Sequence, residues 1–200
     1  MTEDTYKTIV GQAEGIYTEK RSKFIAIALP VRTIDEIKAH LEVYQKKYYD
    51  ARHVCYAYML GHERKDFRAN DNGEPSGTAG KPILGQINSN ELTDILIIVV
   101  RYFGGTKLGV PGLIAAYKES TAQVLAECEI IEKTVDVTLR VEFAYVAMND
   151  GMRIVKDMQP RIVEQTFDNL CTMTLSIRES ESEQLLGRLN KVEGATVDVL

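Results

Sequence analysis

The run of six apolar residues at 95–100 constrains the fold more than any other feature of this chain. A strand with one face in water alternates apolar and polar side chains, whereas an unbroken apolar run of this length is typical of a strand covered on both faces. Six residues are also far fewer than the roughly 20 that a membrane-spanning helix needs. We therefore expect a central strand between two packed layers, in a protein without a membrane partner.

Other segments of residues 1–133 have the patterns of strands and helices that can surround this strand. Thr33 and Glu36 have capping-box spacing, which marks the start of a helix. We expect paired strands at 8–17 and 22–29, a helix over 33–48, a strand at 53–58 and a helix over 113–127. These elements predict an α+β domain, a sheet backed by helices.

Residues 134–200 predict a second domain with the order βαββαβ. Strict alternation at 135–143 places Val137, Leu139 and Val141 on one side of a strand. The remaining elements are a helix capped by Asn149, strands at 161–167 and 171–178, a helix that Ser180 opens, and a strand at 195–199. This is the ferredoxin-like split arrangement, so the predicted domains are 1–133 and 134–200.

The open face of this second sheet does not have the pattern of an RNA-binding platform. RNA-recognition modules of the same topology place aromatic side chains on their central strands to stack bases. The outward positions here are Thr138, Arg140, Glu142, Thr172, Thr174, Ser176 and Arg178. The segment also has seven basic against eleven acidic residues. We therefore predict an accessory domain that docks a protein partner.

Charge and cysteine content exclude several classes of function. With 24 basic and 29 acidic residues the chain has a net charge of −5, so an anion site must be local rather than a coating for nucleic acid. Cys55, Cys128 and Cys171 lack metal-binding spacing and are expected to be reduced, buried thiols. The acidic residues at the start of the chain do not resemble a signal peptide, so a cytoplasmic location is expected.

The first segment that could carry chemistry is DNGEPSGTAGKP at 71–82, with three glycines and two prolines. Pro75 and Pro82 stand where a phosphate-binding P-loop needs a glycine and a hydroxyl. Ser76 is not the centre of a nucleophile elbow either. Asp71 and Glu74 remain open as an acid–base pair or a cation site, although no third ligand is visible.

The second segment is RYFGGTKLGVPG at 101–112, between the apolar strand and a predicted helix. A glycine turn followed by a helix N-terminus presents free N–H groups to an anion, and Arg101 and Lys107 add positive charge. The same glycines also suit a tight crossover with no ligand. His53 and Cys55 share one face of their strand, which indicates either packing or a Cys–His nucleophile.

Four segments occur in order and at suitable spacing: KRSKFI at 20–25, HVCYA at 53–57, DNGEPSGTAGKP at 71–82 and VRYFGGTKLG at 100–109. Together they resemble the IMPACT family, and the whole chain resembles its bacterial two-domain branch, the YigZ-type proteins. Two positions depart from the family pattern. Asn72 stands where a second aspartate is usual, and Val110-Pro111 replace a small residue and a glycine.

The resemblance implies an N-terminal fold of the ribosomal protein S5 domain 2 type and a C-terminal domain similar to a ferredoxin-like domain of elongation factor G. It also implies a link to translation, because eukaryotic relatives regulate the kinase that senses amino-acid starvation by competing for its activating partner on ribosomes. Bacteria lack that kinase. For this branch, binding to nucleic acid or to the ribosome is therefore a suggestion from fold similarity.

The leading hypothesis is a non-enzymatic, translation-associated protein that contacts RNA phosphate or a ribosomal surface. Its predicted anion-binding residues are Lys20, Arg21, Lys23, Lys81, Arg101, Gly104, Gly105 and Lys107, beside a functional loop of Asp71, Gly73, Glu74, Pro75, Ser76 and Gly77. The cluster at 20–23 also suits a solvated turn. We assign no catalytic residue, metal or cofactor.

Two other hypotheses remain. The first is a small enzyme or sensor that holds a phosphorylated metabolite or nucleotide between 71–82 and 101–112, with Glu74 or His53 as the acid–base group. The second is a protein-interaction module that works through residues 134–200.

Overall fold

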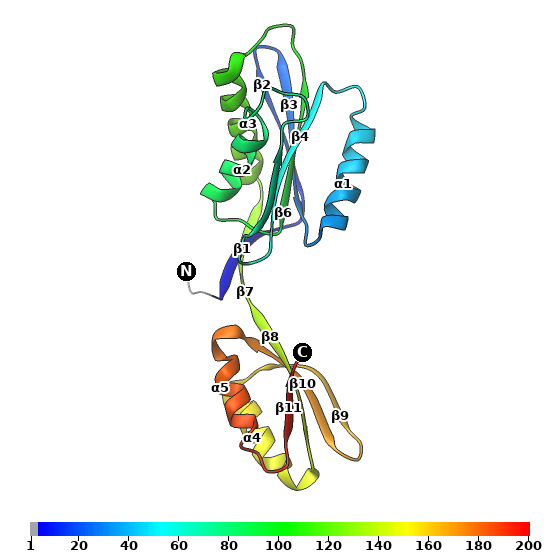
Figure 1. Cartoon of the computed structure of the whole chain (residues 1–200), viewed down its shortest axis with the longest axis vertical. Coiled ribbons are helices and arrows are strands. Elements are labelled where there is room, and N and C mark those ends of the chain that lie inside the picture. The colour runs from blue at the N-terminus through cyan, green and yellow to red at the C-terminus, as the bar shows by residue number, and fades with distance from the viewer. Residues whose placement is uncertain (1–3) are drawn as a thin grey trace. The chain divides into compact units, whose positions relative to one another are not determined.

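The computed structural model describes residues 4–200, and its contacts divide them into two compact units. The larger unit is Tyr6–Lys133. The smaller unit is Thr134–Leu200, and residues 4 and 5 group with it. Each unit combines a sheet with helices, so the chain is a two-domain α+β protein (Figure 1). None of the helices in this part of the chain has the length and hydrophobicity that a membrane crossing requires.

The larger unit is built on a five-stranded antiparallel sheet with the order β2-β3-β6-β4-β5. Its strands are β2 Ala13–Glu19, β3 Ser22–Pro30, β4 His53–Leu60, β5 Asp66–Asn70 and β6 Ile95–Tyr102. β6 is the central strand, and residues 95–100 are fully buried.

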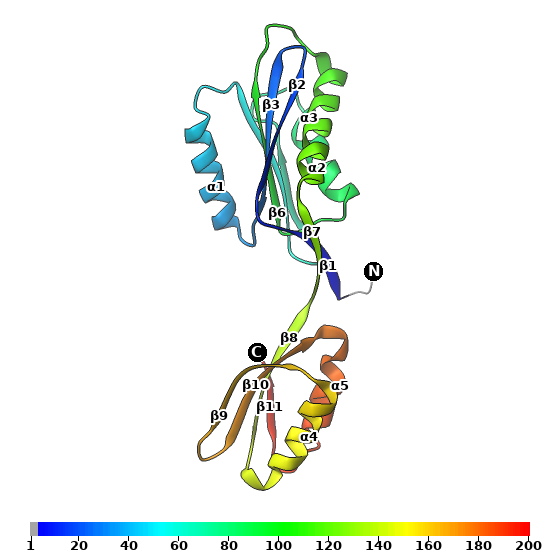
Figure 2. The same cartoon turned by 180° about the vertical axis from the view of Figure 1, so that it is seen from behind.

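Helices cover both faces of this sheet, as Figures 1 and 2 show. α1 (Ile34–Lys47) covers one face and packs on the alternate β6 side chains that include Ile98. α2 (Gly80–Ser89) and α3 (Gly109–Ala126) cover the other face and pack on the side chains that include Ile97. The prediction of a central strand covered on both faces is therefore confirmed.

Several expected boundaries in this unit are wrong. The strand expected at 8–17 is two strands, because Gly11, with φ of 69°, turns the chain between β1 (Thr5–Val10) and β2. β1 pairs instead with β7 (Glu129–Thr134). The helix expected from 113 begins four residues earlier, at Gly109. Pro111 fits its first turn because no N–H is needed there. β5 and α2 were not expected.

The smaller unit has the predicted βαββαβ order. Its elements are β8 Asp136–Phe143, α4 Met148–Met158, β9 Arg161–Phe167, β10 Cys171–Arg178, α5 Glu179–Leu189 and β11 Thr196–Val199. The sheet order is β11-β8-β10-β9, with every neighbouring pair antiparallel. Alternate side chains of β8 and β10 pack with α4 and α5 into a third core. α4 begins after a short 3₁₀ turn (Tyr145–Ala147) rather than behind a cap at Asn149.

The start of α5 depends on Asp4, so the capping box expected at Ser180 is wrong. The Asp4 carboxylate accepts hydrogen bonds from Arg178 Nε at 2.6 Å and from the Ser180 backbone N–H at 3.2 Å. These bonds hold the pKa of Asp4 well below its usual range. The cap comes from a residue more than 170 positions earlier, which no local pattern indicates.

Two helical glycines of this unit give a test of its packing. A Cβ on Gly151 of α4 would lie 2.7 Å from Cζ of Phe143, whose ring is only 1% exposed. We expect Gly151→Ala to lower the free energy of unfolding by about 1–3 kcal/mol. A Cβ on Gly187 of α5 meets nothing within 4 Å, so Gly187→Ala should raise it by about 0.5–1 kcal/mol. Urea unfolding measures both changes. If the two variants changed the free energy of unfolding equally, the close packing of Gly151 on Phe143 would be contradicted.

Candidate functional site

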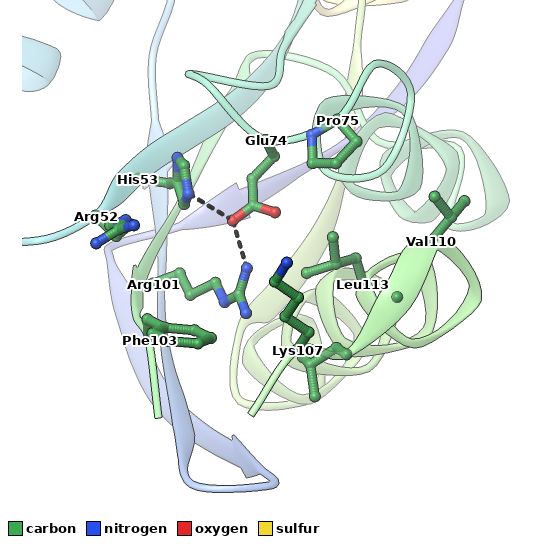
Figure 3. Close-up of a pocket in the computed structure, with 11 residues that line it drawn as sticks. Arg52, His53, Glu74, Pro75, Arg101, Phe103, Lys107, Val110 and Leu113 are labelled. Carbon is green, nitrogen blue, oxygen red and sulfur yellow. Dashed lines mark hydrogen bonds and ion pairs between the residues drawn. The ribbon is translucent and has the colours of Figure 1, made fainter. Parts of the chain in front are cut away.

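A pocket of about 460 Å³ lies in the larger unit between the loop after β5 and the start of α3 (Figure 3). Both loops singled out from the sequence contribute to it, together with the start of β4. The eleven lining residues are Arg52, His53, Glu74, Pro75, Arg101, Phe103, Lys107, Leu108, Gly109, Val110 and Leu113.

Strand register assembles the polar centre of this pocket. His53, the first residue of β4, is directly opposite Arg101 near the end of β6. The loop that follows β5 carries Glu74 to this end of the sheet, where its carboxylate contacts both side chains. Three residues that are far apart in the sequence therefore meet, as Figure 3 shows.

The carboxylate of Glu74 is the centre of the arrangement, and its side chain is 1% exposed. Its Oε1 accepts a hydrogen bond from Arg101 Nη1 at 2.7 Å and lies 3.0 Å from His53 Nε2. His53 Nδ1 lies 2.7 Å from the backbone carbonyl of Asn72. Because a carbonyl only accepts, Nδ1 carries a hydrogen and donates it. Nε2 therefore faces the carboxylate, and His53 and Glu74 form an ion pair when the imidazole is protonated.

Arg101 is buried in the pocket wall. Its side chain is 7% exposed, and Nη2 donates to Ser22 Oγ at 3.4 Å. The guanidinium carbon lies 5.7 Å from the ring centres of both Phe24 and Phe103. Nε has no hydrogen-bond partner among residues 4–200. Arg101 is therefore a fixed positive charge that Glu74 compensates, rather than a mobile side chain at the surface.

Gly104 joins the first hairpin to the loop after β6. A Cβ at Gly104 would overlap the backbone of Arg21 and Ser22, so only glycine fits. The Gly104 N–H donates to Ser22 Oγ at 3.2 Å, the same oxygen that Arg101 contacts. The turn at Lys20 and Arg21, where both residues have positive φ, therefore packs directly against this loop.

Asp71 and Glu74 have separate roles, so they do not act as an acid–base pair. Asp71 Oδ1 accepts from the backbone N–H groups of Ala79 at 3.1 Å and Gly80 at 2.8 Å, and Oδ2 accepts from Gly77 at 2.9 Å. Asp71 thus caps the N-terminus of α2. Burial alone would raise the pKa of Asp71, but these three donors hold it below the ordinary value.

Cys55 does not form a nucleophile with His53. Burial raises the pKa of the Cys55 thiol to about 12, so the thiol is protonated at neutral pH. Its Sγ lies 3.0 Å from the Asp71 carbonyl and 3.4 Å from the Tyr117 hydroxyl. Nor does any group of three His, Cys, Asp or Glu side chains within the described residues have the arrangement of a metal site.

Two exposed cations complete the pocket. Within residues 4–200 neither Lys107 nor Arg52 is in an ion pair, and the Arg52 guanidinium carbon lies 5.9 Å from the ring centre of Phe103. α3 begins at Gly109 with no side-chain cap and no acidic residue in its first turn. Three cations against one carboxylate give the pocket a net positive charge, which favours an anion beside the helix N-terminus.

The other predicted site residues lie outside the pocket lining. Exposed residues among them are Lys20 and Arg21 at the β2–β3 turn, Lys23 near the start of β3, Lys81 in the first turn of α2, and Gly73, Ser76 and Gly105 in loops. Sequence reasoning missed Arg52 and Phe103. Arg52 directly precedes the segment 53–57, and Phe103 lies within the segment 101–112, so both were next to or among the residues that the sequence did single out.

The role of Asp71 predicts a defined pH dependence. Because folding lowers its pKa, the ionised cap stabilises the fold at neutral pH, and this stabilisation is lost as pH falls below the ordinary value of 3.8. We expect Asp71→Asn to lower the free energy of unfolding by about 1 kcal/mol at pH 7 and to lessen its decline in acid. Urea unfolding at several pH values measures this. Asp168→Asn, at an exposed position, is the control. If the free energy of unfolding declined equally with falling pH in the wild type and in both variants, Asp71 would not act as an ionised cap of α2.

Comparison with known proteins places these features in a family. The Impact N-terminal domain family model matches residues 20–125, more than half of the chain and a span that contains the whole pocket. IMPACT family member YigZ of Escherichia coli (strain K12) is 34% identical over 151 residues, covering 70% of this chain and 74% of that protein. IMPACT family member YvyE of Bacillus subtilis (strain 168) is 37% identical over 129 residues, covering 64% of this chain and 59% of that protein.

The fold is also found in a solved structure. A crystal structure of a hypothetical protein has a TM-score of 0.71 at 24% identity and covers 98% of this chain and 97% of its own. At that identity the likeness concerns the fold alone. The family model and the sequence relatives together show that this chain belongs to the IMPACT family.

Proposed function

We propose that this protein is a translation-associated binding protein whose N-terminal domain contacts RNA phosphate on the ribosome through the pocket. One observation carries the proposal. In a chain of net charge −5, the pocket combines three cations, an uncapped helix N-terminus and a single carboxylate. A positively charged pocket in an acidic protein suits a local phosphate contact rather than general coating of nucleic acid.

The exposed and the buried basic residues of the pocket have different roles in the proposed phosphate contact. Lys107 is the direct phosphate ligand, because it is exposed, lines the pocket and is outside any ion pair within the described chain. Arg101 supports it from the wall with a fixed charge. Gly104 holds the turn against the first hairpin, and Gly105, with open space where a Cβ would lie, lets the turn approach the RNA. Exposed basic residues outside the pocket would extend the contact along the RNA backbone; they are Lys20, Arg21, Lys23 and Lys81.

The family supplies the link to translation. The segments that carry the IMPACT resemblance, at 71–82 and 100–109, are the walls of the pocket. The translation role that the resemblance implies is therefore assigned to this site, and a cytoplasmic location follows from a ribosomal partner.

The proposal also includes the domain type to which each of the two units is related. We assign the larger unit to the ribosomal protein S5 domain 2 type, and residues 134–200 to the ferredoxin-like domains related to elongation factor G. The βαββαβ order and the strand order β11-β8-β10-β9 support the second assignment. We assign to this domain a protein partner, with the exposed edge strand β9 as its contact.

A second candidate is a small enzyme or sensor for a phosphorylated metabolite. The observation that favours it is the 3.0 Å contact between His53 Nε2 and Glu74 Oε1, which lies in the wall of a pocket formed by both predicted loops. An acid–base group beside an anion site is the arrangement such an enzyme needs.

Ribosome co-sedimentation tests the leading proposal. Wild-type affinity should fall steeply with salt, with log K changing by about 0.7–0.9 per phosphate contact for each tenfold change in salt. Lys107→Glu should weaken binding and reduce that slope by about 1. Lys118→Glu, an exposed position on the same helix but outside the pocket lining, should bind like the wild type. If the protein does not bind ribosomes, or if its affinity does not change with salt, the proposal is wrong. If it binds ribosomal protein but not ribosomal RNA, the proposed RNA phosphate contact is wrong and a protein surface of the ribosome takes its place.

A thermal-shift screen with phosphorylated metabolites tests the second candidate. A ligand at 100 times its dissociation constant should add about 2.7 kcal/mol of stability. The shift should be absent in Lys107→Glu and present in Lys118→Glu. A screen in which no metabolite stabilises the wild type argues against this candidate.

A further inference from the structure

We propose that the pocket binds one nucleotide of a single strand by its base as well as by its phosphate, with the base stacked on Phe103. The inference rests on the proposed function. It adds the base to the phosphate contact as a second part of the ligand that the pocket recognises.

Phe103 gives the pocket an exposed aromatic surface. It is 44% exposed, although it directly follows the buried strand β6. Pro75, Val110 and Leu113 add further apolar lining. A site for inorganic phosphate alone needs no apolar wall, because all its contacts are polar. Apolar lining beside a few placed charges is typical of pockets for larger organic ligands.

Two guanidinium groups accompany the Phe103 ring. Figure 3 shows the ring beside Arg101, whose guanidinium carbon is 5.7 Å from the ring centre. Arg101 is more than nine-tenths buried and paired with Glu74, so its charge stays in a fixed position beside the ring, and its Nε has no hydrogen-bond partner among residues 4–200. Arg52, whose guanidinium carbon is 5.9 Å from the same ring centre, is exposed. An exposed aromatic ring accompanied by arginines is an arrangement on which proteins stack the bases of single-stranded nucleic acid.

Pocket size and access narrow the ligand further. A volume of about 460 Å³ lies within the range of about 300–1,000 Å³ that small-molecule sites occupy, and one phosphate would fill little of it. Bases inside a duplex are already stacked, so only an unstacked base can reach the ring. Single-stranded RNA and a free nucleotide share this chemistry of a planar base joined to a phosphate.

The test uses the full chain and a fluorescent single-stranded RNA of six nucleotides, with the matching duplex, AMP and inorganic phosphate as further probes. The single strand should bind at least tenfold more tightly than the duplex. Phe103→Leu keeps an apolar side chain but removes the ring, and should weaken single-strand binding about tenfold. Phe103→Trp should restore it. Phe67→Leu, at another exposed aromatic residue, is the matched control and should bind like the wild type.

The outcomes separate this inference from the function on which it rests. Binding that Lys107→Glu abolishes but Phe103→Leu leaves unchanged would overturn the stacking and keep the phosphate contact. Binding of neither RNA nor inorganic phosphate would overturn both. If Phe103→Leu weakens binding, the AMP probe identifies the ligand. AMP that binds as tightly as the oligomer indicates a free nucleotide, and binding of the oligomer but not of AMP indicates RNA.

Discussion

The buried ion pair between Glu74 and Arg101 is the interaction on which the pocket depends. Each partner is almost completely withdrawn from water, so each would be an uncompensated charge without the other. Removing one partner of such a pair typically costs about 3–5 kcal/mol, because the remaining charge stays desolvated. The pair therefore constrains the loop after β5 to return to the end of β6, and the pocket exists where these segments meet.

Further contacts spread from this pair. Ser22 Oγ contacts both Arg101 and the Gly104 N–H, which ties the first hairpin to the loop before α3. His53 connects the same carboxylate to β4 and, through Asn72, to the start of the 71–82 loop. The segments that carry the family resemblance are thus parts of one hydrogen-bonded assembly.

The site divides charges that look equivalent in the sequence. Asp71 and Glu74 are three positions apart, yet Asp71 binds backbone N–H groups at α2 while Glu74 binds side chains of the pocket. Arg101 and Lys107 are six positions apart, yet one is buried and paired and the other is exposed. In the proposed anion site, the exposed cations and the α3 N-terminus would contact the ligand, and the buried charged groups would contribute to the electrostatic potential around them.

Local patterns in the sequence were enough to place the central strand and the βαββαβ domain. Both depend on hydrophobic periodicity, which is a property of neighbouring residues: 95–100 have no polar face, and 135–143 alternate strictly. The two loops that line the pocket were also singled out, because glycine and proline concentrate where the chain changes direction. The starts of α2 and α3 were not predicted because of the same glycines and prolines. A helix that begins with these residues lacks the capping residue that usually marks a helix start in the sequence.

The sequence by itself therefore determined which segments are buried, in what order the second domain is built and which loops have unusual backbone. Only the tertiary structure decided which charges are paired and which are free. Strand register places His53 opposite Arg101, and the chain reversal after β5 brings Glu74 to both. Asp4 caps a helix more than 170 residues away for the same reason. Pairing between distant residues depends on the path of the folded chain, whereas periodicity depends only on adjacent positions.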